Sequence, residues 1–560
     1  MHLQRFIQGS SFLLFLLALI EAAAPIIWLW PSDGFIRMDP IAALGTLLAD
    51  RHFPPLMWIA GLVVLFSAIT GRFFCAYLCP MGTALDISDF LLRSHRRSSR
   101  RRFNRPFRQF KFYLLAFILG ASALGVSAVF IASPLSLITR FFVLIVHPAA
   151  TFLVDMGLDM FRPVADWMDQ SAMAYAAVKV PRYDLQWTTL IIIFGLFAGG
   201  LWAPRFWCRY LCPSGALLAL FARRSVFRRK VLSNCTQCGW CAKKCPMGAI
   251  GGNCKDGSAN AGITDHAECI VCLSCVNGCP SQSVRFAFQA KTRSIAPASP
   301  SETVSAQRRR ILMAGLSGAA SALVSLTGLK SPHAGPGPGS IIPPGVIRPP
   351  GAVPEKAFLA RCIRCGACMQ ACPTNSLQPL GLNAGLSALF SPVVTPRRGP
   401  CDPSCNACGR VCPTGAVAPL PIMEKRWVKM GTARIVREKC LAWELGKKCL
   451  ICDEVCPFDA VELRRHPERS IAVPFIDENR CAGCGYCEHF CPVRATPAII
   501  VGPMLALRLT GGSYQAAARE RGYTLEPGGK SQRRPPGHIG PDRSGPIPLD
   551  ENGLPPGFTE

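Results

Sequence analysis

Long apolar runs alternate with basic loops over the first 230 residues. A helix that crosses a bilayer needs about 20 apolar residues. Four runs reach this length: Phe6–Trp30, Pro55–Phe74, Phe110–Ala132 and Trp187–Trp207. A weaker run, Leu135–Met156, contains Arg140, His147 and Pro148. It predicts an interfacial or re-entrant helix. The pattern therefore predicts an α-helical membrane bundle of four spans over residues 1–230.

The loops of this bundle differ in charge, which predicts its orientation. The loop from Arg93 to Lys111 holds ten Arg, Lys and His residues, and a second basic cluster, Arg223–Lys230, follows the fourth run. Cytoplasmic loops are enriched in Lys and Arg. We therefore expect both basic loops, and the cysteine-rich segment after them, to face the cytoplasm.

The pattern changes beyond residue 230. Arg308, Arg309 and Arg310 precede a run of small apolar residues, which predicts a twin-arginine-like export signal or a fifth span. The predicted order is a membrane domain (1–230), a two-cluster ferredoxin module (231–290), the signal or fifth span (305–330), a Pro/Gly linker (331–354), a four-cluster module (355–505) and a disordered tail (506–560). Because the second module follows an export-type segment, we expect it to be periplasmic.

The chain carries a formal net charge of +27 and 29 cysteines. A basic chain often binds nucleic acid. Here much of the charge lies beside apolar runs, and the formal count treats every cysteine as neutral. Each oxidised cubane with four thiolate ligands carries about −2. Nucleic acid is therefore not an expected partner.

Two CxxCxxCxxxCP motifs occupy residues 231–290. In this motif three thiolates hold one [4Fe-4S] cluster and the fourth cysteine ligates the neighbouring cluster. The first predicted ligand set is Cys235, Cys238, Cys241 and Cys279, and the second is Cys269, Cys272, Cys275 and Cys245. Zinc sites usually have two separated cysteine pairs, and disulfides are rare in the cytoplasm. Cys254 lies between the two motifs and belongs to neither, so we expect it to be a loop thiol that ligates no cluster.

Residues 355–505 repeat the motif four times. The predicted ligands are Cys362, Cys365, Cys368, Cys372, Cys401, Cys405, Cys408, Cys412, Cys440, Cys449, Cys452, Cys456, Cys481, Cys484, Cys487 and Cys491. The second motif has one extra residue in its first gap, and the third has eight residues after Cys440. The chain is thus expected to hold six clusters. We favour pairing the outer motifs, with Cys491 completing the first, and pairing the inner motifs. Sequential pairing is the alternative.

Two further pairs, Cys75 with Cys79 and Cys208 with Cys212, belong to an internal repeat that reads Arg-Phe-aromatic-Cys-x-Tyr-Leu-Cys-Pro-x-Gly. Cysteines at i and i+4 share a helical face. We expect the four thiols to converge at the cytoplasmic membrane face and to hold a seventh cluster. A thiol/disulfide redox pair and inert thiols are the alternatives.

These motifs resemble a known family. The membrane domain, both CxxxCP pairs and the first module resemble the NapH/MauN-type membrane ferredoxins, with kinship to the NosR membrane domain. Residues 308–500 resemble the NapG/MauM-type polyferredoxins. The two parts usually occur as separate proteins and here are fused. The implied fold is a membrane bundle of four spans and a probable fifth, with two α+β bacterial-ferredoxin-like modules.

The resemblance implies a multi-pass protein of the bacterial cytoplasmic membrane. It would pass electrons from the membrane quinol pool through [4Fe-4S] clusters to a periplasmic acceptor, a reductase or a c-type cytochrome. An electron-donating maturation or reactivation factor for a periplasmic metalloenzyme is the rival. Glu21, inside the first apolar run, is the candidate proton acceptor of a quinone site, because intramembrane carboxylates are costly.

Overall fold

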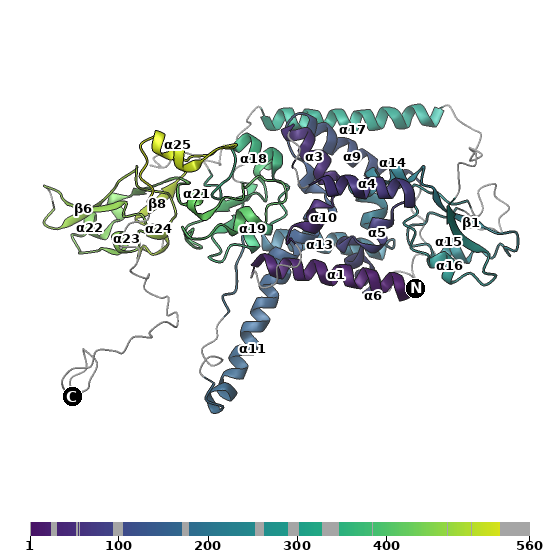
Figure 1. The fold of residues 1–560 in the computed structure, drawn as a ribbon, viewed down its shortest axis with the longest axis horizontal. Coiled ribbons are helices and arrows are strands. Elements are labelled where there is room, and N and C mark those ends of the chain that lie inside the picture. The colour runs from purple at the N-terminus through teal and green to yellow at the C-terminus, as the bar shows by residue number, and fades with distance from the viewer. Residues whose placement is uncertain are drawn as a thin grey trace.

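The computed structural model describes residues 2–23, 31–51, 54, 57–92, 105–170, 178–251, 263–288, 302–326, 346–382, 385–467, 469–493 and 496–526. Most of the basic loop at 93–104, Cys254 and the stretch 331–345 lie outside these ranges. Figure 1 shows a central bundle of helices with a strand-containing module at each end.

The bundle is built from helices of very different length. It contains α1 (His2–Ala23), α2 (Gly34–Arg37), α3 (Pro40–Asp50), α4 (Trp58–Thr70), α5 (Phe73–Tyr77), α6 (Pro80–Leu91), α8 (Arg105–Arg108), α9 (Phe110–Ala123), η2 (Val129–Ile131), α10 (Pro134–Phe141), the π-helical η3 (Phe142–Val146), α11 (His147–Trp167), α13 (Gln186–Ala198), η4 (Gly199–Leu201), the π-helical η5 (Trp207–Leu211) and α14 (Pro213–Ala222). Proline and an N-cap side chain start several of them, as Asp39 does for α3.

Two helices in the described ranges are long and apolar enough to cross a membrane, Leu3–Ala23 and Pro134–Trp167. The other three predicted spans contain shorter helices, α4, α9 and α13. The prediction of four spans is therefore not confirmed. Two of these helices end at a glycine with left-handed backbone, Gly71 after α4 and Gly125 beyond α9, which stops the helix before the apolar run ends. The run predicted to be interfacial lies within the second long helix.

Helix α17 (Glu302–Leu326) lies beside α9 along the length of the bundle (Figure 1). The two helices approach closely through small residues. A Cβ atom on Gly120 would lie 2.1 Å from the carbonyl oxygen of Gly315, and one on Gly318 would lie 2.1 Å from that of Phe117. Helix packing through small residues is typical of membrane bundles. The segment predicted as a signal or a fifth span is thus a packed helix of the bundle.

The first module is a small α+β unit next to α14. It contains β1 (Phe227–Val231), α15 (Trp240–Lys244), α16 (Ser274–Asn277) and β2 (Val284–Phe288). The two strands pair antiparallel from Phe227↔Phe288 to Val231↔Val284. The strands bracket both cysteine motifs, so the module begins at residue 227, four residues before the predicted boundary.

The second module repeats this plan twice. Its elements are α18 (Glu355–Arg361), α19 (Ala367–Gln370), β3 (Leu377–Pro379), η8 (Leu386–Ala388), β4 (Pro392–Val394), α20 (Ala407–Arg410), α21 (Ile422–Arg426), β5 (Thr432–Ile435), η9 (Arg437–Lys439), α22 (Leu441–Glu444), α23 (Ile451–Glu454), β6 (Val461–Arg465), β7 (Ala472–Ile476), α24 (Tyr486–His489), β8 (Ile499–Gly502) and α25 (Tyr514–Glu520). A bridge between Ala352 and Val417 brackets the first two motifs, and β5 paired with β8 brackets the last two.

Two predicted boundaries of the second module are wrong. The end of the predicted linker is packed, because Arg348 is buried and forms an ion pair with Glu355. The start of the predicted disordered tail is also folded. Helix α25 begins at the N-cap Ser513, and Glu424 accepts the backbone N–H of Tyr514. These polar contacts tie down a segment whose composition alone suggested disorder.

Candidate metal-cluster sites

The cysteines of the modules gather around four cavities. The first is lined by Cys245, Cys269, Cys272 and Cys275, the second by Cys372, Cys401, Cys405 and Cys408, the third by Cys456, Cys481, Cys484 and Cys487, and the fourth by Cys440, Cys449, Cys452 and Cys491. We name them sites II, IV, V and VI. Each takes three ligands from one motif and one from its partner, as the motif predicts.

Two more sites follow by the same exchange. Cys368 interacts electrostatically with Cys362, Cys365 and Cys412, which together form site III. The remaining set, Cys235, Cys238, Cys241 and Cys279, forms site I by the motif rule, and that assignment stays a prediction. The 28 cysteines in the described ranges form no disulfide.

The structure contradicts the favoured pairing of outer with outer motifs. Cys491 completes site VI with the third motif, and Cys372 completes site IV with the second. The pairing is sequential. The physical reason is the strand pairing: β5 with β8, and Ala352 with Val417, each close around two consecutive motifs.

The four standard-spaced motifs share one backbone conformation around their second cysteine. The residues on either side of it have positive φ, for example Arg364 and Gly366 around Cys365, and Gly483 and Gly485 around Cys484. Left-handed backbone is unfavourable for most residues, so its repetition indicates that the loop must curl around a common centre. The two motifs with a longer first gap, around Cys405 and Cys449, do not show this pattern. The longer loop before the second cysteine can pass around the centre without the two residues of positive φ.

Backbone and hydroxyl groups are placed to donate hydrogen bonds to the last cysteine of several motifs. The N–H of Ala249 donates to Sγ of Cys245 at 3.3 Å, and that of Ala460 donates to Cys456 at 3.4 Å. At Cys279 the hydroxyl of Ser283 is 3.4 Å from the sulfur, and this contact lowers the pKa of the thiol to about 7. Hydrogen bonds of this kind favour thiolate over thiol and tune cluster potentials.

Cys75, Cys79, Cys208 and Cys212 come together in the bundle as expected. All four are buried, with 4–8% of their surface exposed. Cys212 interacts electrostatically with the other three. It also caps α14 and accepts the N–H of Gly215 at 3.2 Å, as the proline-linked cysteines of the modules accept theirs. We call this group the four-thiol site.

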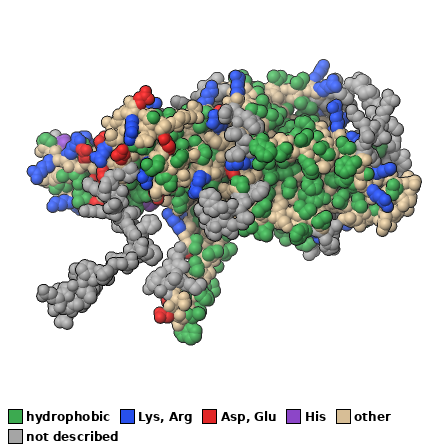
Figure 2. All heavy atoms as spheres, viewed as in Figure 1, with side chains coloured by type: hydrophobic (Ala, Val, Ile, Leu, Met, Phe, Trp, Pro, Cys, Tyr) green, Lys and Arg blue, Asp and Glu red, His purple; other side chains and the backbone are tan. Residues whose placement is uncertain are grey.

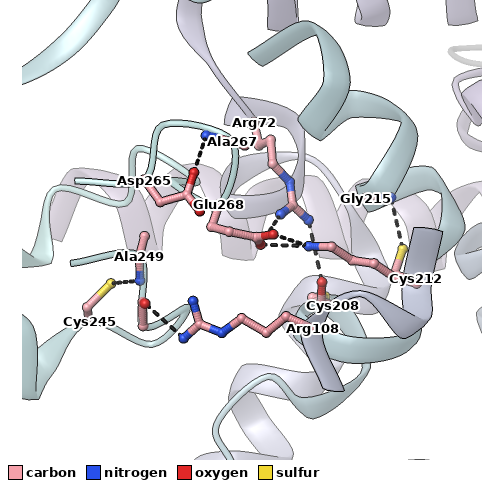
Figure 3. Close-up of polar contacts among 12 residues, drawn as sticks. Arg72, Arg108, Cys208, Cys212, Gly215, Cys245, Ala249, Asp265, Ala267 and Glu268 are labelled. Atoms are coloured by element: carbon pink, nitrogen blue, oxygen red, sulfur yellow. Dashed lines mark hydrogen bonds and ion pairs between the residues drawn. The ribbon is translucent and has the colours of Figure 1, made fainter. Parts of the chain in front are cut away.

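Buried cations lie between the four-thiol site and the first module, and Figure 3 shows Arg72 reaching towards Glu268 and Cys208. Glu268 of the first module accepts hydrogen bonds from Arg72 at 3.1 Å and from Lys111 at 2.5 Å, and both cations are fully buried. Burial alone would raise the pKa of Glu268, but the two cations hold it below its usual value. Arg72 also donates to the carbonyl of Cys208. Glu268, Arg72 and Lys111, which we call the triad, thus join the four-thiol site to the first module.

Buried charged side chains of both signs lie around the four-thiol site. Arg72, Lys111 and Arg205 are buried there and form ion pairs with Asp86 and Glu268, and Asp39 and Asp89 are further buried carboxylates of the same region. Among the residues that the structure describes, Nε of Arg72 and Nε of Arg209 have no hydrogen-bond partner. Buried charge requires compensation. A cubane with four thiolates carries about −2, so these residues fit an anionic cluster.

Sequence reasoning missed Asp39, which is 1% exposed and accepts hydrogen bonds from the hydroxyls of Ser133 and Ser214. It interacts electrostatically with Cys79. The Asp-Pro pair at the start of α3 predicts an N-cap, and only the structure shows its burial beside the thiols. The expected carboxylate, Glu21, lies near the end of α1 and is partly exposed.

Sites III to VI follow one another in a line. Cys412 and Cys372 join sites III and IV, and Cys456 and Cys491 join sites V and VI. Sites IV and V meet where the N–H of Cys401 donates to the carbonyl of Cys484 at 2.8 Å. Site VI therefore lies at the far end of the module, where Figure 1 places α22 and α23.

The bundle touches the cluster sites at both ends. The Tyr77 hydroxyl donates to the carbonyl of Val271 beside site II, and Ser136 donates to that of Ile363 beside site III. One hydrophobic cluster contains the four buried thiols together with Cys272 and Cys365. A single apolar core thus connects site II, the four-thiol site and site III.

In the described ranges, no three His, Cys, Asp or Glu side chains are arranged to hold a single metal ion. A four-iron cluster needs a wider ligand spacing than one ion does, and the four cavities above provide separated sulfurs around a common space. The ligand sets, their loop geometry and the hydrogen bonds to sulfur are those of bacterial-type clusters.

Family profiles match the cysteine-rich segments. One described as a 4Fe-4S binding domain matches residues 52–99 and 185–233, the two segments with the CxxxCP pairs. Profiles described as 4Fe-4S dicluster domains match residues 234–284 and 447–495, and a further 4Fe-4S binding domain matches 359–378. No solved structure matches the chain. The fold, the sites and these matches define an iron-sulfur electron-transfer protein.

Curated relatives identify the family. The ferredoxin-type protein NapG of Escherichia coli is 39% identical over 170 residues, 29% of this chain and 70% of the relative. The methylamine utilization ferredoxin-type protein MauM is 40% identical over 157 residues in Paracoccus denitrificans (27% of this chain, 66% of the relative). In Methylobacillus flagellatus it is 32% identical over 174 residues (30% and 71%). The chain belongs to this family of NapG- and MauM-like polyferredoxins and spans about two thirds of the length of these relatives.

Proposed function

We propose that the protein is a membrane electron relay that oxidises quinol in the helical bundle and delivers the electrons through [4Fe-4S] clusters to a periplasmic acceptor. One observation carries the proposal: cluster sites contact both ends of a bundle whose apolar core also contains four buried thiols. A relay needs closely spaced redox centres, and clusters at these sites would supply one-electron carriers.

The four-thiol site is proposed to hold a seventh cluster, next to site II. The buried Nε of Arg72, which has no hydrogen-bond partner among the described residues, supports this, as does the N–H bond to Cys212, which repeats the arrangement at Cys245 and Cys456. In the relay, Arg72 and Arg205 would stabilise the thiolates. Asp39, buried beside Cys79, would be positioned to accept a proton from quinol.

The bundle is proposed to cross the cytoplasmic membrane along the line that joins the two modules. The side chains on its surface support this placement, because large apolar residues are exposed on every long helix, such as Phe6, Leu65, Phe194 and Leu312. Figure 2 shows hydrophobic side chains covering the bundle between the modules. The first module would then be cytoplasmic and the second periplasmic.

Site VI is proposed to be the exit of the relay, because it is the last in line and farthest from the bundle. The eight-residue gap between Cys440 and Cys449 contributes Leu441 to the lining of site VI and exposes Leu445, Lys447 and Lys448. A periplasmic reductase or c-type cytochrome would receive the electrons there, by analogy with the family.

The experiment is the reduction of the full-length, cluster-loaded protein by quinol in phosphatidylcholine vesicles. We expect cluster absorbance to bleach on addition of a reduced quinol, and the Cys212→Ser variant to bleach only with dithionite. The matched control is Cys254→Ser, which removes a thiol outside every ligand set. If the wild-type clusters stay oxidised with quinol but bleach with dithionite, the proposed function is wrong.

A further inference from the structure

Helix α11 carries all its charged side chains on one narrow face. Between residues 148 and 167 the polar residues are Thr151, Asp155, Asp159, Arg162 and Asp166. Their spacing of three or four places them in one stripe along the helix, and the rest of its circumference is apolar. The polar side faces the chain that returns to the bundle, since Asp155 accepts the N–H of Val178 at 3.2 Å.

The apolar side of α11 is open. Phe152 is 56% exposed, Met160 77% and Trp167 86%. With Leu153, Val154, Met156, Phe161 and Val164, these side chains form one continuous surface along a helix of 21 residues, about 31 Å. Contiguous apolar surface of this extent is unusual on a part of a protein that faces water.

The direction of α11 indicates what covers this surface. Figure 1 shows α1 and α17 running along the line that joins the two modules, whereas α11 leaves the bundle across that line. It leaves where the bundle meets the second module, because α10, η3 and α11 form one continuous helix and Val143 of η3 lies 3.5 Å from a Cβ built on Gly366. Figure 2 shows α11 as a largely hydrophobic projection.

We propose that α11 lies in the outer lipid–water interface, with its apolar side in the lipid and its polar stripe towards the second module. The inference rests on the proposed placement of the bundle, in which the line between the modules is the membrane normal. A helix that runs across this line at the junction with the second module lies along the membrane surface.

The apolar surface of α11 continues that of the bundle, because η3 packs against α13, where Trp187 and Phe194 are 77% and 72% exposed. The charge of α11 selects the kind of lipid. Three aspartates against one arginine do not attract anionic headgroups, so the surface is matched to zwitterionic lipid and held by apolar contact alone. Helix α11, which we call the interfacial arm, would fix the tilt of the second module relative to the membrane surface.

The test uses the full-length, cluster-loaded protein in two sets of phosphatidylcholine vesicles. One set contains phosphatidylcholine with a carbene-generating group near the headgroup, and the other has this group at the end of an acyl chain. After illumination, labelled peptides are mapped by mass spectrometry. We expect the headgroup-level probe to label α11 and the chain-end probe to label α4 near Leu65 but not α11.

A pair of variants makes the test specific. Leu153→Asp with Met160→Asp should lower headgroup-level labelling of α11 about fivefold or more, because it charges the apolar side. Asp159→Asn in the polar stripe should leave the labelling unchanged. Absence of label on α11 while α4 is labelled, or chain-end label along all of α11, would overturn the interfacial arm. So would crosslinking of α11 to a second copy of the chain. Absence of label on α4 would instead overturn the membrane placement itself.

Discussion

At the scale of single residues, Glu268 forms ion pairs with two cations that are buried where the bundle meets the first module. Arg72, from the loop before α5, and Lys111, at the start of α9, both reach it. These residues are 196 and 157 positions away from Glu268 in the sequence. The triad therefore fixes the position of site II relative to the four-thiol site.

Replacing Glu268 by Gln should destabilise the protein strongly. It would leave Arg72 and Lys111 buried without their counter-charge, and breaking a buried pair costs about 3–5 kcal/mol. We expect a lower thermal midpoint and loss of the site II cluster from the purified full-length protein. Glu444→Gln, at an exposed position, is the control. Equal midpoints for both variants would contradict the role of the triad.

Single cysteines also test the corrected pairing. Cys440 and Cys491 both line site VI, so Cys440→Ser, Cys491→Ser and the double variant should each lack the same cluster, about four irons. Cys362→Ser combined with Cys491→Ser should lack about eight irons, because these cysteines belong to sites III and VI. Iron and sulfide analysis decides. If the first double variant loses eight irons and the second loses four, pairing of the outer motifs is correct after all.

At the scale of elements, α17 depends on glycine for its contact with α9. A side chain at Gly318 would meet the backbone of Phe117, whereas nothing lies within 4 Å of a Cβ at Gly195 in α13.

We expect Gly318→Leu to separate the two helices and expose α17 to protease, and we expect the matched change Gly195→Leu to have little effect. Limited proteolysis of the protein in vesicles measures this difference. If both variants are cut at the wild-type rate, α17 is not held in the bundle by this contact.

The elements also show what the sequence can predict. The cysteine motifs of the modules are local, so their spacing alone located them, and the repeat around Cys75 and Cys208 predicted that two distant pairs meet. Pairing of the motifs failed because it depends on which strands close around them, for example Thr432 opposite Gly502. The triad at Glu268 and the burial of Asp39 depend on contacts across the fold, for which the local sequence has no signal. The fold of residues 513–520 was missed because Glu424, which accepts the backbone N–H of Tyr514, lies in another element.

At the scale of the whole molecule, the sites form a line that starts in the bundle and ends at site VI. Sites III and IV exchange cysteines, sites IV and V meet through Cys401 and Cys484, and sites V and VI exchange cysteines again. Site VI contacts the rest of the line through site V. This arrangement predicts that electrons reach site VI in order, and that a break at site V isolates it.

The most direct test of the relay compares quinol-reducible iron in ⁵⁷Fe-labelled protein reconstituted in vesicles, measured by Mössbauer spectroscopy. Loss of site VI in Cys449→Ser should remove one cluster from the quinol-reducible pool. Loss of site V in Cys484→Ser should remove two, because site VI remains assembled and reducible by dithionite but is no longer reached from the bundle. If quinol still reduces site VI when site V is missing, the linear relay is contradicted.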